Sequence, residues 1–261
     1  MEIDVHKMPL IAAQVTDPAD FDAICPMDHD AWLTPYNPQL KHFRPVFATR
    51  EESIAYVKTR SITALENADP NRFTIKVTDD ETGEIIGCAS WEVNDPTAKG
   101  EDEGPTKTLA TWHPEGSEQR EFAEIFIDGL WGFLAARVDR PHMDLHSIVV
   151  HPSHRHRGAG RLLIRWGTAK ADELGIETVV SSLASARGAY EKCGLGCIEI
   201  IPPDPKLATR LAELEKEREN GKIDAGLKWK ELLEDDLSGY LMWRPVGRDW
   251  RDGDKAPWKD S

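Results

Sequence analysis

Residues 143–174 read MDLHSIVVHPSHRHRGAGRLLIRWGTAKADEL, and this stretch decides the fold. Its first part predicts a strand, because a β-branched apolar run ends at Pro152. Its last part predicts a helix, because apolar residues recur at helical spacing from Leu162 to Leu174. A basic loop with two glycines, residues 154–160, joins the two elements.

This loop has the properties of an anion site. The N–H groups at a helix N-terminus have no partner within the helix, the helix dipole favours negative charge, and glycine lets a ligand approach the backbone. Arg155, Arg157 and Arg161 add positive charge to a chain whose net charge is −14. We therefore predict that a polyanionic ligand binds here.

The overall composition excludes several classes of protein. With 32 basic and 46 acidic residues, the chain is not expected to bind nucleic acid or an anionic membrane. The first residues lack the apolar run of a secretory signal, and no apolar stretch approaches the length of a membrane span. The four cysteines are scattered without a Cys-x-x-Cys pair. We expect a cytoplasmic or nucleocytoplasmic protein with reduced thiols.

Hydrophobic periodicity predicts an alternation of strands and helices along the chain. The expected strands are residues 9–16, 72–78, 84–93, 143–150, 177–183, 194–201 and 238–246. The expected helices are residues 17–32, 49–66, 118–139, the stretch ending at Leu174, and 186–193. Paired strands early and alternating strand–helix units late indicate a mixed α/β sheet with helices on both faces.

We expect one domain over residues 1–261, with a core at about 9–201 and a closing strand at 238–246. Residues 94–117 are rich in proline, glycine and charge and are predicted to form a surface excursion. Residues 202–237 are predicted to form a charged helical insertion on the surface, and residues 247–261 a polar tail. In the helix at 118–139, a broad buried face is expected from Phe122, Phe126, Leu130, Trp131, Phe133 and Leu134.

Two motifs resemble a known family. Arg155 to Gly160 fits the R/Q-x-x-G-x-G/A signature of the GNAT superfamily, the CoA-dependent N-acetyltransferases. About thirty residues downstream, ARGAYEKCGL (186–195) resembles the segment A-x-x-x-Y-E-K-x-G-F of that family. The final YLMWRP resembles its closing strand, and the whole pattern is most similar to the broad fungal GNAT group. His156 departs from the pattern, because glycine often follows the first arginine.

The resemblance implies a GNAT-like fold, a mixed and mostly antiparallel central sheet that is splayed between its fourth and fifth strands. It also implies that acetyl-CoA is the co-substrate and that the pantetheine arm runs along Ile148, Val149 and Val150. The pyrophosphate would rest on the loop and the first helical turn. That implied binding site consists of Arg155, His156, Arg157, Gly158, Ala159, Gly160 and Arg161.

The resemblance also implies catalytic roles. Tyr190 would protonate the departing thiolate. A base must deprotonate the acceptor, since an amine with a pKa near 10.4 costs roughly 4–5 kcal/mol to neutralise at pH 7. Asp144 is the first candidate, because strand alternation places it on one face with His146 and Ile148, although it could equally fix a strand end. His146 is the second candidate and Glu92 the third.

These features predict direct transfer of an acetyl group to an amine in a ternary complex, with a small molecule or a protein as acceptor. A non-catalytic acyl-CoA-binding module is the alternative. No metal is expected, because the histidines of residues 142–156 lack a carboxylate or cysteine at ligand spacing. Nothing in the sequence pairs Cys193 with a base, and Trp91, Trp112 and Trp131 are more readily core residues than pocket walls. The oligomeric state cannot be read from the sequence.

Overall fold

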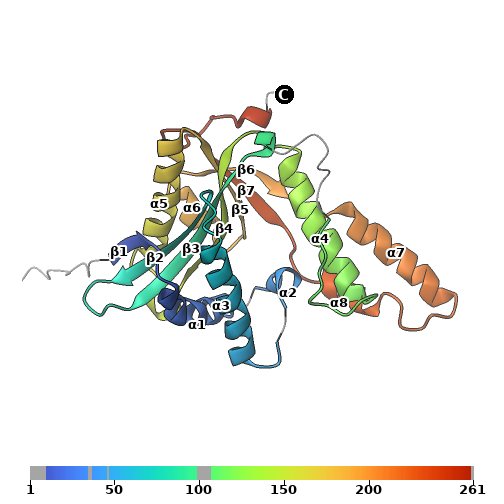
Figure 1. Cartoon of the computed structure of the whole chain (residues 1–261). Coiled ribbons are helices and arrows are strands. Elements are labelled where there is room, and N and C mark those ends of the chain that lie inside the picture. Colours follow the sequence, from blue (N-terminus) through green and yellow to red (C-terminus); the bar gives the residue numbers. More distant parts are fainter. Residues whose placement is uncertain (1–9, 35–36, 46, 99–106, 260–261) are drawn as a thin grey trace, which may run out of the picture.

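The computed structural model describes residues 10–34, 37–45, 47–98 and 107–259, and it confirms the mixed α/β fold (Figure 1). The strands form one sheet in the order β1-β2-β3-β4-β5-β7-β6. Every neighbouring pair is antiparallel except β4 and β5. The strands are β1 (Leu10–Gln14), β2 (Arg72–Asp79), β3 (Ile85–Asn94), β4 (His142–Val150), β5 (Glu177–Ser182), β6 (Gly196–Ile201) and β7 (Gly239–Arg244).

Helices lie on both faces of this sheet, as predicted (Figure 1). They are α1 (Phe21–Trp32), α2 (Leu40–Phe43), α3 (Arg50–Glu66), α4 (Glu118–Ala135), α5 (Ala159–Leu174), α6 (Arg187–Glu191), α7 (Pro205–Glu219) and α8 (Leu227–Leu233). Helix α3 starts where the sequence predicts, because Thr49 and Glu52 form a reciprocal capping box. Helix α4 ends at Ala135 rather than Asp139.

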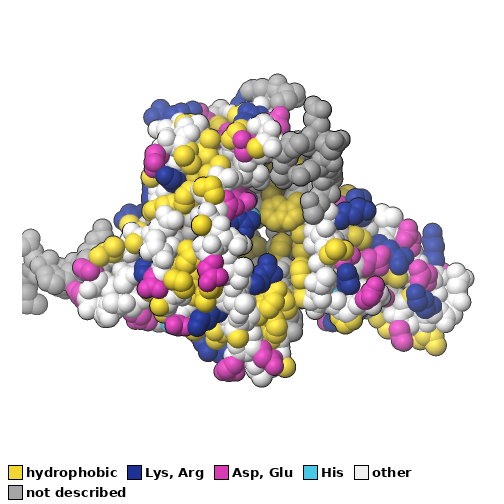
Figure 2. Space-filling model, viewed as in Figure 1, with side chains coloured by type: hydrophobic (Ala, Val, Ile, Leu, Met, Phe, Trp, Pro, Cys, Tyr) yellow, Lys and Arg dark blue, Asp and Glu magenta, His cyan; other side chains and the backbone are white. Residues whose placement is uncertain are grey.

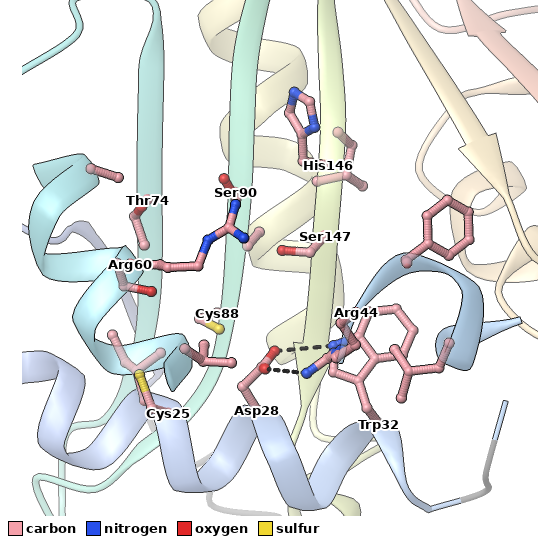
Figure 3. Close-up of a pocket in the computed structure, with 18 of the residues that line it drawn as sticks. Cys25, Asp28, Trp32, Arg44, Arg60, Thr74, Cys88, Ser90, His146 and Ser147 are labelled. Carbon is pink, nitrogen blue, oxygen red and sulfur yellow. Dashed lines mark hydrogen bonds and ion pairs between the residues drawn. The ribbon is translucent and has the colours of Figure 1, made fainter. Parts of the chain in front are cut away.

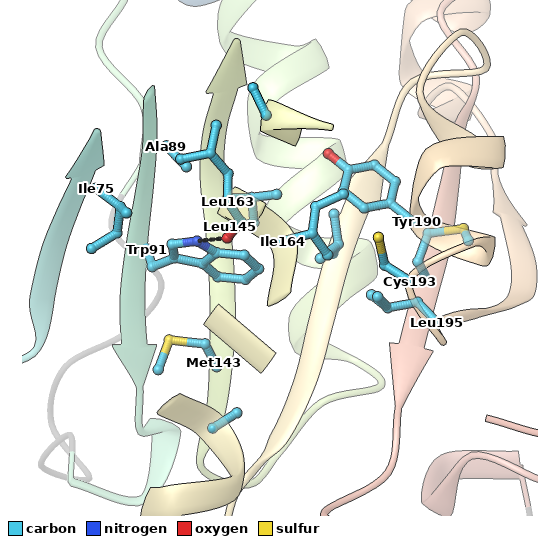
Figure 4. Close-up of a cluster of buried hydrophobic side chains, with 14 of the residues drawn as sticks. Ile75, Ala89, Trp91, Met143, Leu145, Leu163, Ile164, Tyr190, Cys193 and Leu195 are labelled. Atoms are coloured by element: carbon cyan, nitrogen blue, oxygen red, sulfur yellow. Dashed lines mark hydrogen bonds between the residues drawn. The ribbon is translucent and has the colours of Figure 1, made fainter. Parts of the chain in front are cut away.

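Helix α5 packs on one face of the sheet through the largest apolar cluster (Figure 4). Trp91 is fully buried at its centre and donates a hydrogen bond from Nε1 to the Leu163 carbonyl, 3.3 Å away. The absence of a side chain at Gly167 makes this contact possible, since a Cβ there would lie 2.2 Å from the indole. On the opposite face, α1 and α3 cover Cys88 and Val149.

The segment 202–237 does not simply lie on the surface, which corrects the prediction. It forms two helices, but α7 and α8 enclose a second apolar cluster with α4. Trp229 is fully buried there, stacks edge-on against Phe122 and donates to the Leu207 carbonyl at 2.9 Å. The prediction failed because half a dozen apolar residues of this segment, although few in number, gather in one cluster with α4, while Ile223 and Leu227 stay exposed. On α4 itself, Trp131 is 43% exposed and does not belong to the expected buried face.

The polar tail, described over residues 247–259, packs against the rest of the chain. The Trp250 amide donates to the Gly194 carbonyl at 2.8 Å, and the indole of Trp250 covers Gly196, where a Cβ would lie 2.2 Å away. Asp249 forms ion pairs with Arg165 and Arg244. The segment therefore closes over the end of the sheet at β6 and β7.

The excursion at 94–117 lies partly outside the described residues, since 99–106 are not among them. Its second part has no helix or strand, and two backbone amides tie it to α4. Thr108 donates to Asp128 at 2.9 Å and Ala110 donates to Glu124 at 3.1 Å. Within the described ranges, none of the helices combines the length and apolar character required to cross a bilayer.

Candidate active site

The parallel strands β4 and β5 separate after a short contact. They pair only through His142, Met143 and Asp144, opposite residues 177–179. Beyond that point, β4 continues to Val150 while pairing with β3 alone among the described strands. The predicted splay is thus confirmed, and the edge of β4 at Ile148–Val150 that faces β5 has no strand partner.

The open edge of β4 leads directly into the loop before α5. Gly158 is the residue before that helix and has φ +100°, a left-handed conformation that suits glycine. The amides of Ala159, Gly160 and Arg161 occupy the first turn, where no acceptor exists within the helix. His156 has φ +65°, which explains physically why glycine would be the easier residue at this position.

Two of the predicted phosphate-binding side chains have other partners. Arg155 donates to the carbonyls of Val150 at 3.2 Å and Ala31 at 3.1 Å, and so it ties the end of β4 to the end of α1. Arg157 donates to the buried carboxylate of Asp79 at 2.6 Å and contacts His154. This guanidinium holds the pKa of Asp79 below its usual range. Their guanidinium groups therefore hold the loop in place.

Arg161 lies in the first turn of α5, is exposed and has no ion-pair partner in the described part of the chain. Its charge lies near Cys193, which follows α6 and packs in the apolar cluster beneath α5. Of the three arginines singled out in the sequence, Arg161 alone keeps a guanidinium available to an anion.

A cavity of about 600 Å³ lies on the face of the sheet opposite α5, between the strands and helices α1, α3 and α4. Figure 2 shows the hollow with hydrophobic side chains at its base, and Figure 3 shows the polar residues that line it. Ser181 and Leu183 also line it, so it reaches the point where β4 and β5 separate. A volume of this size accommodates a small organic molecule.

Asp144 and His146 both line this cavity. A bulge between Leu145 and Ser147, opposite Ser90 and Trp91, inserts an extra residue into β4 and breaks the alternation. Asp144 and His146 therefore share the cavity as predicted, but Ile148 does not share their face. It packs instead against the core beneath α5.

These two side chains belong to a charged cluster. His146 Nε2 lies 2.9 Å from Glu92 Oε2 and 4.0 Å from Asp144 Oδ2. Arg72 lies 2.9 Å from the same Glu92 oxygen. Glu92 thus contacts both His146 and Arg72, and these two contacts hold the pKa of Glu92 below its usual range. It is held as an anion and is poorly suited to accept a proton.

The pKa values of the two remaining groups are both raised. Burial raises the pKa of Asp144 above its usual 3.8, and the neighbouring Glu92 charge adds to this. The contact with Glu92 raises the pKa of His146 above 6.5. The contact with Glu92 favours the protonated form of His146, which cannot accept a proton, whereas burial makes the Asp144 carboxylate a stronger base than an ordinary one. Asp144 is therefore the better placed proton acceptor of the two.

Tyr190 lies on α6, is 4% exposed and packs within the apolar cluster beneath α5. Burial raises the pKa of its phenol, which therefore stays protonated. Figure 4 shows the hydroxyl directed away from Cys193 and toward the β4 side of the cluster. The residue does not line the 600 Å³ cavity, so Tyr190 does not share that cavity with Asp144 and His146.

The three tryptophans divide between the two predicted possibilities. Trp91 is a core residue, as favoured from the sequence. Trp131 is exposed and lines the cavity, which corrects that interpretation, whereas Trp112 lines the cavity and also packs against the apolar cluster of α4, α7 and α8. Cys193 is buried, and burial raises the pKa of its thiol, so a thiolate is disfavoured.

Sequence reasoning missed a further group of cavity residues on α1, α3 and the intervening segment. Asp28 lies 3.5 Å from Arg44 and accepts a hydrogen bond from Trp32 Nε1 at 3.1 Å. The Arg44 guanidinium also lies 5.4 Å from the Trp32 ring centre. Arg60 extends into the same cavity from α3 (Figure 3). Only the helical spacing of Asp28 and Trp32 could have indicated this arrangement.

Comparison with protein-family models identifies the family of this chain, because residues 32–195 match the model of the acetyltransferase (GNAT) family. The chain belongs to the GNAT acetyltransferase family. The match includes β4, the loop, α5 and α6, which are the elements that build the splay. No curated protein matched the sequence.

Solved structures show the same fold at low sequence identity. The acetyltransferase is similar to a structure from Corynebacterium glutamicum described as histone acetyltransferase HPA2 and related acetyltransferase. That match has a TM-score of 0.51 and 18% identity, and it covers 94% of this chain and 100% of the other. It is also similar to the mosquito arylalkylamine N-acetyltransferase like 5b, with a TM-score of 0.52, 14% identity and coverage of 90% and 99%.

Proposed function

We propose that this acetyltransferase moves an acetyl group from acetyl-CoA to an amine by direct attack in a ternary complex. The observation that carries the proposal is the unpartnered edge of β4, which runs from the cavity to the N-terminus of α5. A ligand that combines an extended amide-bearing arm with a pyrophosphate matches both features, since the strand edge offers hydrogen bonds and the helix terminus offers amides.

In this proposal, Ile148, Val149 and Val150 present their backbone to the pantetheine arm. The amides of residues 158–161 and the free charge of Arg161 hold the pyrophosphate. Arg155 and Arg157 keep the loop in place through Ala31 and Asp79. A backbone N–H near Val150 is available to stabilise the oxyanion that forms when the thioester is attacked.

The acceptor enters from the cavity on the opposite side of β4. Asp144 takes a proton from the ammonium form of the acceptor, and the neutral nitrogen bonds to the acetyl carbon. The carbon–sulfur bond then breaks, and the nitrogen loses its second proton to solvent to give the amide. The departing thiolate receives a proton from Tyr190 or from solvent. His146 stays paired with Glu92 and stabilises the Asp144 carboxylate. The products are an N-acetyl amide and free CoA.

A turnover assay with acetyl-CoA and a panel of primary amines tests the proposal by detecting the free thiol. Amine-dependent thiol release is expected, and it should fall when Asp144 is replaced by Asn. The exposed Asp139 is a matched control, because it lies outside the cavity on the surface. Calorimetric CoA binding without turnover on any amine would instead support a non-catalytic acyl-CoA-binding module.

A further inference from the structure

The cavity contains two groups of opposite charge that do not pair with each other: Arg60, which has no carboxylate partner among the described residues, and Asp144, whose nearest cation is His146. Arg60 is exposed, and its only partner in the described structure is the neutral hydroxyl of Tyr56, 2.8 Å away. Asp144 has His146 at 4.0 Å, but that histidine lies closer to Glu92. The other charges in the cavity wall, Asp28 and Arg44, compensate each other.

Hydroxyl groups line the floor of the cavity between these two charges. Thr74, Ser90 and Ser147 occupy paired positions on β2, β3 and β4, so they form a row across three adjacent strands. All three line the cavity, and none of their hydroxyls has a hydrogen-bond partner within the described residues. Figure 3 shows the Arg60 guanidinium extended over this row toward Ser90. A few convergent polar groups in an otherwise apolar cavity are typical of a ligand site.

The strand register gives the backbone spacing between Ser90, toward which Arg60 extends, and Asp144. Asp144 pairs with Glu92, which lies two residues along β3 from Ser90. With about 3.4 Å per residue and about 4.8 Å between strands, the backbones of Ser90 and Asp144 are about 8 Å apart. A ligand whose groups lie directly above the Ser90 and Asp144 positions needs about 8 Å between them. If one contact of about 3 Å lies along the line between the two positions, about 5 Å is sufficient, so the range is roughly 5–8 Å.

We propose that the acceptor is an amine that carries an oxyanion group, a carboxylate or a phosphate, about 5–8 Å from its nitrogen. The oxyanion is held by Arg60 and the hydroxyls of Thr74, Ser90 and Ser147, and the amine lies at Asp144. This inference rests on the proposed function and names the substrate class of that same site. The α-amine of a free amino acid is excluded, because only two bonds separate it from its carboxylate.

Chain length provides the first arm of the test. Acetylation of ω-amino carboxylates is measured with two to six carbons, each against the alkylamine of equal length that lacks the carboxylate. Each extended bond adds about 1.25 Å, so the advantage of the acid over the plain amine is expected to peak at four to six carbons. A charge-assisted hydrogen bond predicts an advantage of about tenfold to a hundredfold in kcat/KM. Aminoalkyl phosphonates of the same lengths distinguish phosphate from carboxylate.

Charge substitution provides the second arm. Arg60→Gln should remove most of the advantage of the acids and leave the rate with plain alkylamines within about threefold. Arg60→Glu should reverse the preference, so that α,ω-diamines become better acceptors than the acids. Arg251→Gln, a change at an exposed arginine far from the cavity, controls for the overall loss of positive charge.

The outcomes separate the two proposals. Turnover of plain amines without any preference for anionic chains, or a preference that persists in Arg60→Gln, overturns this inference and leaves the proposed function standing. Absence of turnover with every amine refutes the proposed function and this inference with it. Because Arg60 is exposed and makes a single hydrogen bond, its replacement is not expected to impair folding, and unchanged thermal melting confirms this.

Discussion

Replacement of Asp144 by Asn separates the chemical role of this carboxylate from its structural role. The residue is 8% exposed, and Asn preserves its shape while removing the charge. Burial raises the pKa of Asp144, so the folded state binds its proton more tightly than the unfolded chain does. The ionised Asp144 carboxylate therefore lowers the free energy of unfolding at every pH above its raised pKa. This destabilisation disappears as the pH falls below that pKa and the carboxylate is protonated. At pH 7 the Asn variant should melt at a higher temperature than the natural protein.

Activity should move in the opposite direction. At pH 7, deprotonation of an amine with a pKa near 10.4 requires roughly 4–5 kcal/mol, which a base within the site offsets. General bases contribute about a hundredfold to ten-thousandfold, so kcat/KM should fall by that factor. The deficit should shrink by about tenfold per pH unit up to the amine pKa, because the variant depends on amine that is already neutral. The natural enzyme should lose activity in acid with a pKa above 3.8.

The assay combines thiol release over a pH series with thermal melting of both proteins, and Asp139→Asn serves as the matched surface control. A variant that is more stable, less active and recovers at high pH supports the role of a base. An Asn variant with the natural pH profile and rate would refute it, as would a loss of activity that is the same at every pH. A fall in melting temperature would contradict the assigned cost of burying the charge.

Four further predictions address other parts of the structure. Tyr190→Phe should lower kcat by about a hundredfold while Cys193→Ala preserves it, and the reverse result would contradict direct transfer. Trp229→Ala should reduce the free energy of unfolding by about 3–5 kcal/mol in denaturant titrations, because its fully buried indole closes the cluster between α4, α7 and α8. Burial lowers the pKa of His42 from 6.5 to about 4, so the folded protein is destabilised as the pH falls from 6.5 toward 4 and the buried imidazole has to take up a proton. The melting temperature of His42→Phe should therefore fall less over this pH range than that of the natural protein. Gly158→Ala should weaken CoA binding in calorimetry, since φ +100° strains any side chain by about 1–2 kcal/mol, and unchanged affinity would exclude the loop from the site.

The sequence predicted the strands and most helices because local periodicity and capping determine them. Thr49 and Glu52, for example, mark the start of α3 through contacts only three residues apart. The packing of the segments at 202–237 and 247–259 was not predicted, because it depends on distant partners. Trp229 contacts Phe122, and Trp250 fills the space above Gly196, and neither pairing leaves a local pattern.

In the candidate site too, the features set by local sequence were predicted and those set by distant partners were not. The motif located the loop and the first turn of α5, where Gly158 and the free amides lie. It could not show that Arg155 and Arg157 are occupied by Ala31 and Asp79, because those partners come from distant parts of the chain. The bulge at His146 depends on the register with β3, so simple alternation wrongly placed Ile148 on the same strand face as Asp144 and His146.

The central claim is that CoA binds along the open edge of β4 and onto the N-terminus of α5. Hydrogen–deuterium exchange of the full chain with and without CoA tests this most directly, because it reads the backbone amides themselves. The account predicts slower exchange at residues 148–150 and 158–161 when CoA is present, with little change in α7 and α8. Unchanged exchange in both segments under saturating CoA, or protection confined to another region, would contradict the account.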